Sequence, residues 1–312
     1  MSLQAMEEEI SHQALDLPRF AAHLRKAHLP KVKRSSLVFA GSGDSYAAAV
    51  FAQELSKGEA IASDPYELLT NIKRTRGKNL VIVSVSGRTK TNVELARKAN
   101  GIATRTLAIT AHPESPLARG CDETLPLEYR TAGTLTSGTI SFATSLLACA
   151  SLLGNLPTTI QLETTLGTAN RWATNLKPVA KNSFVFAGSG LNYALSIYGA
   201  AKINEVLGVK AEAAYPEQLG HAILFSVDEE RDLIVCLSNS RDKAREVYEF
   251  LRKNDFQTSL LAISGSDAVL RSLKIAIHLQ KLPLAIAKRK RMAECAFLLE
   301  RRKLKLSNKM IY

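Results

Sequence analysis

Glycine and hydroxyl residues gather in three short segments whose composition suits the binding of an anion. Two segments share the string Phe-Ala-Gly-Ser-Gly, at Phe39–Gly43 and Phe186–Gly190, and the third reads Ser84-Val-Ser-Gly-Arg-Thr. Glycine lets the backbone approach a ligand closely, and free N–H groups at the start of a following helix favour a bound anion. Phosphate is the natural candidate. The alternatives are that the glycines only form tight turns and that the Ser and Thr side chains only cap helices.

Charged residues that could transfer protons follow the second glycine turn in the sequence. Lys202 and Glu205 are three residues apart in an Ala-rich helical pattern, so they share one helical face. A carboxylate in such a place can act as a general base. Composition alone favours the simpler interpretation, in which the pair lies solvated on the outer face of the helix.

Alternating strand and helix patterns must position these residues. Apolar β-type runs precede the glycine turns and the Ser84 segment, and similar runs follow at Thr106–Thr110, 233–237 and 259–264, separated by helical patterns. This alternation predicts parallel βαβ units, and the near-continuous Val, Ile and Leu content predicts strands covered on both faces. We therefore predict an α/β fold of parallel sheets flanked by helices, a flavodoxin-like three-layer sandwich. The repeated string also predicts an internal duplication.

Composition limits the class of protein. The chain has 312 residues and 46% hydrophobic residues, enough for two globular domains, and no apolar run approaches the roughly 20 residues of a membrane span. Without a leader-like start, we expect a cytoplasmic protein that does not act at a membrane. The formal charge of +12 is concentrated near the C-terminus, so it does not indicate a nucleic-acid fold. The four scattered cysteines are expected to be buried free thiols.

The order of these motifs resembles the double sugar isomerase (SIS) domain family, whose members bind phosphosugars. The resemblance is strongest to the isomerase half of glucosamine-fructose-6-phosphate synthase and to stand-alone archaeal glucosamine-6-phosphate deaminases, and the opening Met6-Glu-Glu-Glu-Ile-Ser-His-Gln is similar to the start of that unit. It implies two tandem SIS domains. The expected organisation is a helical segment at 1–30, a first SIS domain that binds the phosphosugar at 31–155, a linker at 156–181, a second SIS domain with the catalytic Glu and His at 182–281, and a basic tail at 282–312.

The resemblance also implies where the substrate phosphate binds. Two family loops map closely onto this chain, and a third, around Thr136-Ser-Gly-Thr, maps loosely because its lysine is absent. The phosphate-binding residues implied in this way are Ser42, Gly43, Asp44, Ser45, Ser84, Val85, Ser86, Thr89, Ser137 and Thr139.

The catalytic residues are implied by the same family. Glu205 matches the glutamate that moves a proton between C1 and C2 of the sugar, and His221 matches the histidine that assists ring opening. A histidine titrating near neutrality suits the first task, and a carboxylate suits the second. Lys202 would orient Glu205 or remain structural, and Lys305, or in second place Lys309, matches a tail lysine that forms a Schiff base with the ketose.

Three functions remain open at this stage. The first is a glucosamine-6-phosphate isomerase and deaminase, the second is a bifunctional phosphoglucose and phosphomannose isomerase, and the third is a non-catalytic phosphosugar-binding regulator. The presence of both Glu205 and His221 argues against the third. No cofactor or metal is expected, and no cysteine before Ser36 could serve a glutaminase. We expect a homodimer with a shared active site, because the family histidine comes from the neighbouring subunit.

Overall fold

The computed structural model describes residues 1–27, 33–176 and 183–312, which form two compact units. The β1–β5 unit consists of Leu15–Arg130, Ile140–Ile160 and Arg302–Tyr312. The β6–β9 unit consists of Met1–Ala14, Thr131–Thr139 and Gln161–Arg301. Helix α1 (Ser2–Lys26) therefore contributes residues to both units.

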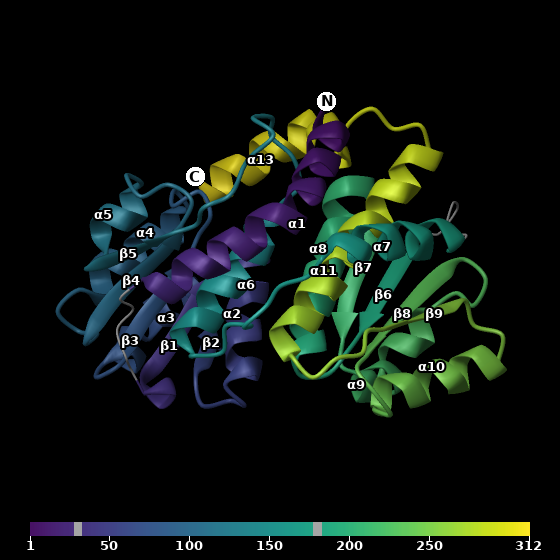
Figure 1. The fold of residues 1–312 in the computed structure, drawn as a ribbon, viewed down its shortest axis with the longest axis horizontal. Coiled ribbons are helices and arrows are strands. Elements are labelled where there is room, and N and C mark those ends of the chain that lie inside the picture. The colour runs from purple at the N-terminus through teal and green to yellow at the C-terminus, as the bar shows by residue number, and fades with distance from the viewer. Residues whose placement is uncertain (28–32, 177–182) are drawn as a thin grey trace. The chain divides into compact units, whose positions relative to one another are not determined.

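The β1–β5 unit contains a five-stranded parallel sheet in the order β2-β1-β3-β4-β5 (Figure 1). Every residue of β1 is buried, as expected for a strand covered on both faces. The strands are β1 (Leu37–Gly41), β2 (Ile61–Ser63), β3 (Asn79–Val83), β4 (Arg105–Thr110) and β5 (Glu123–Pro126). The helices are α2 (Asp44–Leu55), α3 (Pro65–Thr70), α4 (Lys90–Ala99), α5 (Pro116–Gly120), α6 (Ile140–Leu152), most of α13 (Arg301–Ile311), and the short 3₁₀ helices η1 (Arg34–Ser36) and η2 (Ile72–Thr75).

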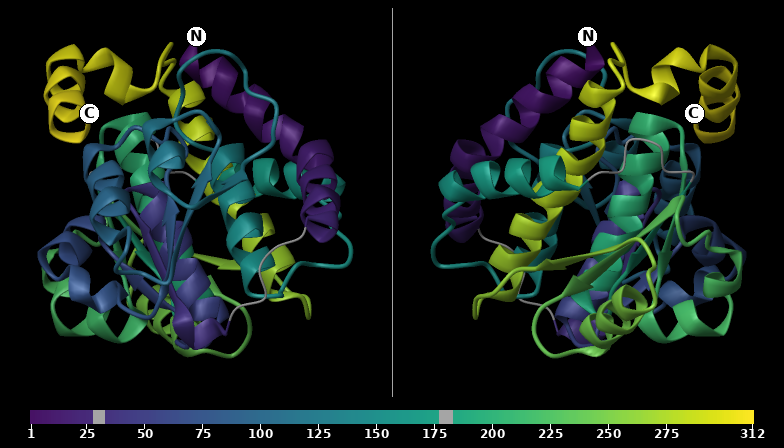
Figure 2. Two further views of the ribbon diagram at one scale, coloured as in Figure 1. Left: turned by 90° about the vertical axis from the view of Figure 1, so that its left-hand side faces the viewer. Right: turned by 90° about the vertical axis from the view of Figure 1, so that its right-hand side faces the viewer.

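The β6–β9 unit contains a four-stranded parallel sheet in the order β7-β6-β8-β9. Its strands are β6 (Ser183–Ala187), β7 (Lys210–Ala214), β8 (Asp232–Ser238) and β9 (Thr258–Ala262). Its helices, besides the start of α1, are α7 (Glu163–Asn175), α8 (Leu191–Leu207), α9 (Pro216–His221), η3 (Ile223–Ser226), α10 (Lys243–Lys253), α11 (Ala268–Arg289) and α12 (Ala296–Leu299). Helices α7 and α11 pack side by side, as both views of Figure 2 show.

Each sheet reverses its strand order at one place. β1 lies between β2 and β3, and β6 lies between β7 and β8. The connection after β1 leads to β2 on one side, and the connection after β2 leads to β3 on the other side; β6, β7 and β8 follow the same pattern. In α/β proteins, ligands bind at the carboxyl ends of the strands at such a reversal. Both glycine turns follow these strands, and the Ser84 segment follows β3.

The predicted α/β class with parallel sheets flanked by helices is confirmed. The range 156–181 that was expected to be a linker holds α7, and the limit expected at 281 falls inside α11, which continues through Pro283. The limits at 30 and 181 lie outside the described residues. The domain limits themselves therefore stay a prediction. Across the three described ranges, no helix combines the length and apolar character that crossing a membrane needs.

Candidate functional site

The first glycine turn joins β1 to α2 with little room for side chains. A Cβ on Gly41 would come within 2.5 Å of the backbone oxygen of Ser45, so only glycine fits there. Gly43 is the N-cap of α2, has φ 60° and ψ −128°, and no side chain caps the helix. Ser42 and Gly43 are exposed, whereas Ser45 is buried. The turn therefore presents backbone at a helix N-terminus, where an anion is favoured.

The second loop joins β3 to α4 on the other side of the same switch point. Gly87 has φ 60°, and a side chain there would collide with Ser115. Ser84 is buried, while Val85, Ser86 and Thr89 are half-buried. Thr89 is the N-cap of α4, yet its side chain makes no capping hydrogen bond in the described structure. Capping therefore does not account for the hydroxyl of Thr89, and this hydroxyl stays available for a ligand.

In the β6–β9 unit, the turn after β6 has the same backbone conformation, but the loop after β8 has different side chains. Gly190 has φ 59° and ψ −131°, nearly the angles of Gly43, and a Cβ on Gly188 would come within 2.7 Å of Asn192 O. Behind β8, however, the N-cap is Asp242, which accepts hydrogen bonds from Asn239 N and Arg245 N, both at 3.1 Å. The carboxylate of Asp242 thus provides this loop with a negative charge of its own. This difference favours the β1–β5 unit as the place for a phosphate.

A compact polar cluster joins α8 to the loop Thr131–Thr139 within the β6–β9 unit. Lys202 Nζ lies 2.6 Å from Glu205 Oε2 and 2.9 Å from Ser137 Oγ, and Ser137 Oγ donates to the same Glu205 oxygen at 2.6 Å. The Lys202 side chain is 0% exposed and that of Glu205 is 40% exposed. The solvated outer-face pair that composition favoured is therefore wrong for Lys202, because its amino group is buried and paired. The Glu205 side chain, in contrast, is partly exposed.

Comparison with known proteins identifies the domain type of one part of the chain. Residues 31–153 match the family model named SIS domain. This part of the chain is a SIS domain. The resemblance that the motifs predicted is thereby confirmed, whereas a second SIS domain after residue 153 stays a prediction.

Similar proteins extend the comparison beyond the SIS domain. Glutamine–fructose-6-phosphate aminotransferase (isomerizing) of Gloeobacter violaceus is 32% identical over 206 residues, 54% of this chain and 33% of that protein. The chain spans about a third of the length of the curated relatives it matches. Glucosamine-6-phosphate deaminase from Thermotoga maritima has a TM-score of 0.74 at 19% identity, over 92% of this chain and 95% of that chain. Tagatose-6-phosphate ketose/aldose isomerase from Escherichia coli has a TM-score of 0.68 at 18% identity, over 91% and 92%. At these identities the two solved structures show a shared fold.

The remaining predicted catalytic residues are exposed. His221, the last residue of α9, has a side chain that is 70% exposed and lies 3.6 Å from Glu217 Oε1. Lys305 and Lys309 lie on α13, where both are exposed. Within the described ranges, these three residues have no buried partner that would hold them at a reaction centre, and their roles stay proposals.

Thiols and carboxylates do not form a metal centre in the described part of the chain. No group of three or more His, Cys, Asp or Glu side chains lies close enough to hold a metal ion there. Burial raises the pKa of Cys121, Cys149 and Cys236 to about 12, which keeps these thiols protonated. All four cysteines are free, and all but the half-buried Cys121 are buried, as expected.

Sequence reasoning missed a carboxylate next to the Ser137 loop. Glu9 is 8% exposed, and its Oε2 accepts from Thr139 Oγ1 at 2.9 Å. Burial is the largest cause that raises the pKa of Glu9, opposed by the hydrogen bond from Thr139. One signal was readable: Glu9 lies beside Met6, Ile10 and Gln13, all 0% exposed, at the spacing of one helical face. Thr139 therefore contacts Glu9, and a phosphate-binding role for Ser137 and Thr139 stays a prediction.

Proposed function

We propose that this chain is an aldose-ketose isomerase of hexose or aminohexose 6-phosphates, most specifically a glucosamine-6-phosphate isomerase and deaminase. The observation that carries the proposal is the partly open Glu205 carboxylate, fixed by the buried Lys202 and by Ser137. A carboxylate held in one position but reachable from outside is what a general base needs. The names of the similar proteins, which act on fructose 6-phosphate, glucosamine 6-phosphate or tagatose 6-phosphate, support the substrate class.

The proposed binding step uses the loops that follow β1 and β3. Backbone groups near Gly43 and the hydroxyls of Ser86 and Thr89 hold the phosphate at the switch point of the β1–β5 sheet. The phosphate takes no part in the reaction. Its binding energy serves to orient the sugar, which lowers the barrier by removing freedom of motion before the proton moves.

The proposed chemical step is a proton transfer followed by release of ammonia. After ring opening, assisted by His221, Glu205 takes the proton from C2 of glucosamine 6-phosphate and returns it to C1, which gives a C2 imine. Water adds to that imine and ammonia leaves, so one glucosamine 6-phosphate and one water give one fructose 6-phosphate and one ammonia. The neutral amine of Lys305, or in second place Lys309, is proposed to condense with the C2 carbonyl of the open-chain ketose to an imine with loss of one water, and hydrolysis of this imine restores the amine and the ketose. With a glucose-type substrate, the same proton transfer gives isomerisation alone.

The test compares turnover and binding in matched variants. We expect the wild-type chain to release ammonia from glucosamine 6-phosphate, and Glu205→Gln to lower kcat by roughly 10²- to 10⁴-fold while keeping its affinity for fructose 6-phosphate. Coupled assays for fructose 6-phosphate and ammonia measure turnover, and titration calorimetry measures binding. Glu249→Gln, which changes an exposed glutamate on α10, serves as the control and should match the wild type.

Each contrary outcome has its own meaning. Turnover of Glu205→Gln near the wild-type rate would remove Glu205 from the mechanism. Rapid isomerisation of glucose 6-phosphate without ammonia release from the amino sugar would replace the deaminase with a phosphoglucose isomerase. Tight binding of phosphosugars without turnover of any of them would support a binding regulator and overturn the enzyme proposal.

A further inference from the structure

The loop Thr131–Thr139 contains no helix or strand of its own. It contains two glycines, of which Gly133 has φ 68°, and no ladder hydrogen bonds fix its path. A segment of this kind loses much conformational freedom when it becomes ordered, so its position depends on specific side-chain contacts. Ser137, which bonds to both Lys202 and Glu205, lies within this loop. The geometry of the Glu205 carboxylate therefore depends on what fixes the loop.

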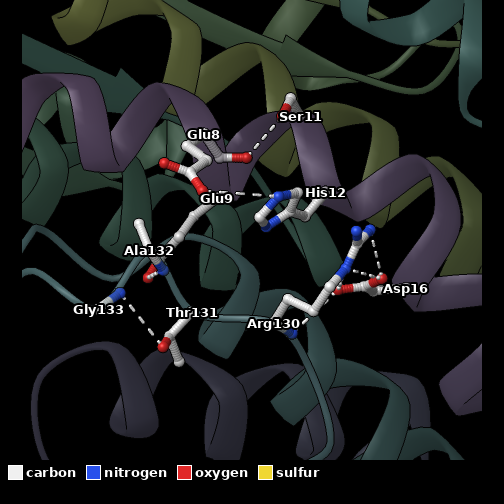
Figure 3. Close-up of polar contacts among 9 residues, drawn as sticks. All are labelled: Glu8, Glu9, Ser11, His12, Asp16, Arg130, Thr131, Ala132 and Gly133. Carbon is white, nitrogen blue, oxygen red and sulfur yellow. Dashed lines mark hydrogen bonds and ion pairs between the residues drawn. The ribbon is translucent and has the colours of Figure 1, made fainter.

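One carboxylate contacts both ends of the loop. Ala132 N approaches Glu9 Oε1 at 3.5 Å (Figure 3), and Thr139 Oγ1 donates to Glu9 Oε2 at 2.9 Å. The two oxygens of Glu9 thus accept from residues on either side of Ser137.

Neighbouring contacts reinforce the Thr139 end. Gln280 Nε2 of α11 donates to Thr139 O at 3.3 Å, and Gln13 Nε2, one turn after Glu9 on α1, donates to Gln280 Oε1 at 2.6 Å. Tyr198 OH donates to Gly138 O at 2.9 Å. All of these residues belong to the β6–β9 unit. In the described structure Gln13 Oε1 is buried without a hydrogen-bond partner, so this network is only partly satisfied.

A buried carboxylate is energetically unfavourable for a contact that has only a structural role. The side chain of Glu9 is largely buried, and the negative charge of the neighbouring Glu8 helps to raise the pKa of Glu9. Burying a carboxylate is unfavourable unless its partners compensate, and an amide or a hydroxyl could also accept from Thr139. A carboxylate offers two oxygens that accept in fixed directions, which suits a clamp on two separate points.

We propose that Glu9 is a positioning residue that sets the Glu205 carboxylate by holding both ends of the Thr131–Thr139 loop and thereby placing Ser137. The inference rests on the proposed function, because Glu205 is taken as the proton-transferring group. Glu9 touches neither Glu205 nor the substrate in this account and acts only through Ser137.

The test uses Glu9→Gln, which keeps the shape of the side chain, and Glu9→Ala, which removes both contacts. Glu8→Gln is the matched control, since the Glu8 side chain is the neighbour on α1 and 52% exposed. We expect kcat to fall about 10-fold in Glu9→Gln and about 100-fold in Glu9→Ala, with the affinity for fructose 6-phosphate unchanged, because misplacement of a reacting group by about 1 Å has effects of that size. Glu8→Gln should behave as the wild type.

Two further readouts separate positioning from a merely structural role. In a double-mutant cycle with Ser137→Ala, the second substitution should add little to the first, because both act through the same hydroxyl. Amide hydrogen exchange of Thr131–Thr139 should become faster in the Glu9 variants and stay unchanged in Glu8→Gln. Additive losses in kcat would overturn the inference even if the variants are less stable.

The exchange experiment also separates this inference from the proposed function. If the wild-type chain turns over none of the phosphosugars, the proposed function fails, and faster loop exchange in Glu9→Gln still supports the clamp. If the wild-type chain is active and loop exchange and kcat in Glu9→Gln are unchanged, the proposed function stands and the role of Glu9 is refuted.

Discussion

Thr89 and Asp242 occupy the same place in the two sheets, each as the N-cap of the helix after the strand that pairs with the glycine-turn strand. Asp242 bonds to two backbone N–H groups, whereas Thr89 makes no capping bond. The loop after β8 therefore has a carboxylate bound to its amides, whereas the helix after β3 has no side-chain cap at its N-terminus.

Replacing Thr89 with aspartate, the residue type that caps the helix after β8, tests this difference. We expect Thr89→Asp to leave the free energy of unfolding unchanged or to raise it by about 0.5–1 kcal/mol, because Asp is a strong N-cap and its charge suits the helix N-terminus. The affinity for fructose 6-phosphate should fall at least about tenfold, since the new carboxylate repels the phosphate and competes for the same amides. Urea unfolding and titration calorimetry measure the two quantities.

The control for this variant is Thr159→Asp, which adds the same charge at an exposed position of the same unit. It should change the affinity less than twofold. Undiminished phosphosugar affinity in Thr89→Asp would move the phosphate site away from the loop that follows β3.

Single functional residues could be predicted from the sequence only where they belong to a short motif. The Lys202 and Glu205 pair was found from its spacing, but its burial was not, because burial depends on what the Thr131–Thr139 loop brings to α8. Glu9 was missed for the same reason: its partners, Ala132 and Thr139, are more than 120 residues away in sequence. Contacts of that range leave no periodic signal in one sequence.

Elements were predictable where apolar runs are long. The apolar runs that form β1, β3, β4, β6, β8 and β9 could be recognised in the sequence, whereas β2, β5 and β7 could not. The missed strands read Ile-Ala-Ser, Glu-Thr-Leu-Pro and Lys-Ala-Glu-Ala-Ala, and each pairs with only one neighbour in its sheet. Edge strands are short and partly polar, so tertiary pairing decides their structure.

The same substitution should have opposite effects in two elements. Gly41→Ala places a Cβ against Ser45 O at the end of β1, so we expect a loss of about 1–3 kcal/mol in the free energy of unfolding. Gly167→Ala lies on α7 with no atom near the new Cβ, so it should gain about 0.5–1 kcal/mol from its better helix propensity. Chemical denaturation of both variants measures the difference. Equal stabilities would mean that the β1 turn can relax around a side chain.

At the scale of the whole molecule, we predict that His221 acts across an interface between two subunits. Its side chain is 70% exposed and lies 3.6 Å from Glu217, which is itself 64% exposed. The proposed role of His221 in ring opening requires contact with the substrate, whereas Glu205 lies in a cluster with a buried lysine. Two large side chains lie on either side of His221 in the sequence: Tyr215, which stacks on Tyr193 and is 40% exposed, and Phe225, which is 86% exposed. Exposed apolar residues of this kind suit an interface with a second copy of the chain.

Mixing two inactive variants tests whether His221 acts in a neighbouring subunit. We expect Glu205→Gln and His221→Ala to be inactive alone and to recover about one quarter of wild-type turnover after they are unfolded together and refolded, because random exchange in a dimer makes half of the molecules mixed and restores one of their two sites. If Glu205 and His221 of the same chain formed each site, the mixed dimer would have no intact site. Turnover that stays at the level of the separate variants, in a sample shown by mass spectrometry to contain mixed dimers, would therefore place His221 with the Glu205 of its own chain or outside the reaction altogether.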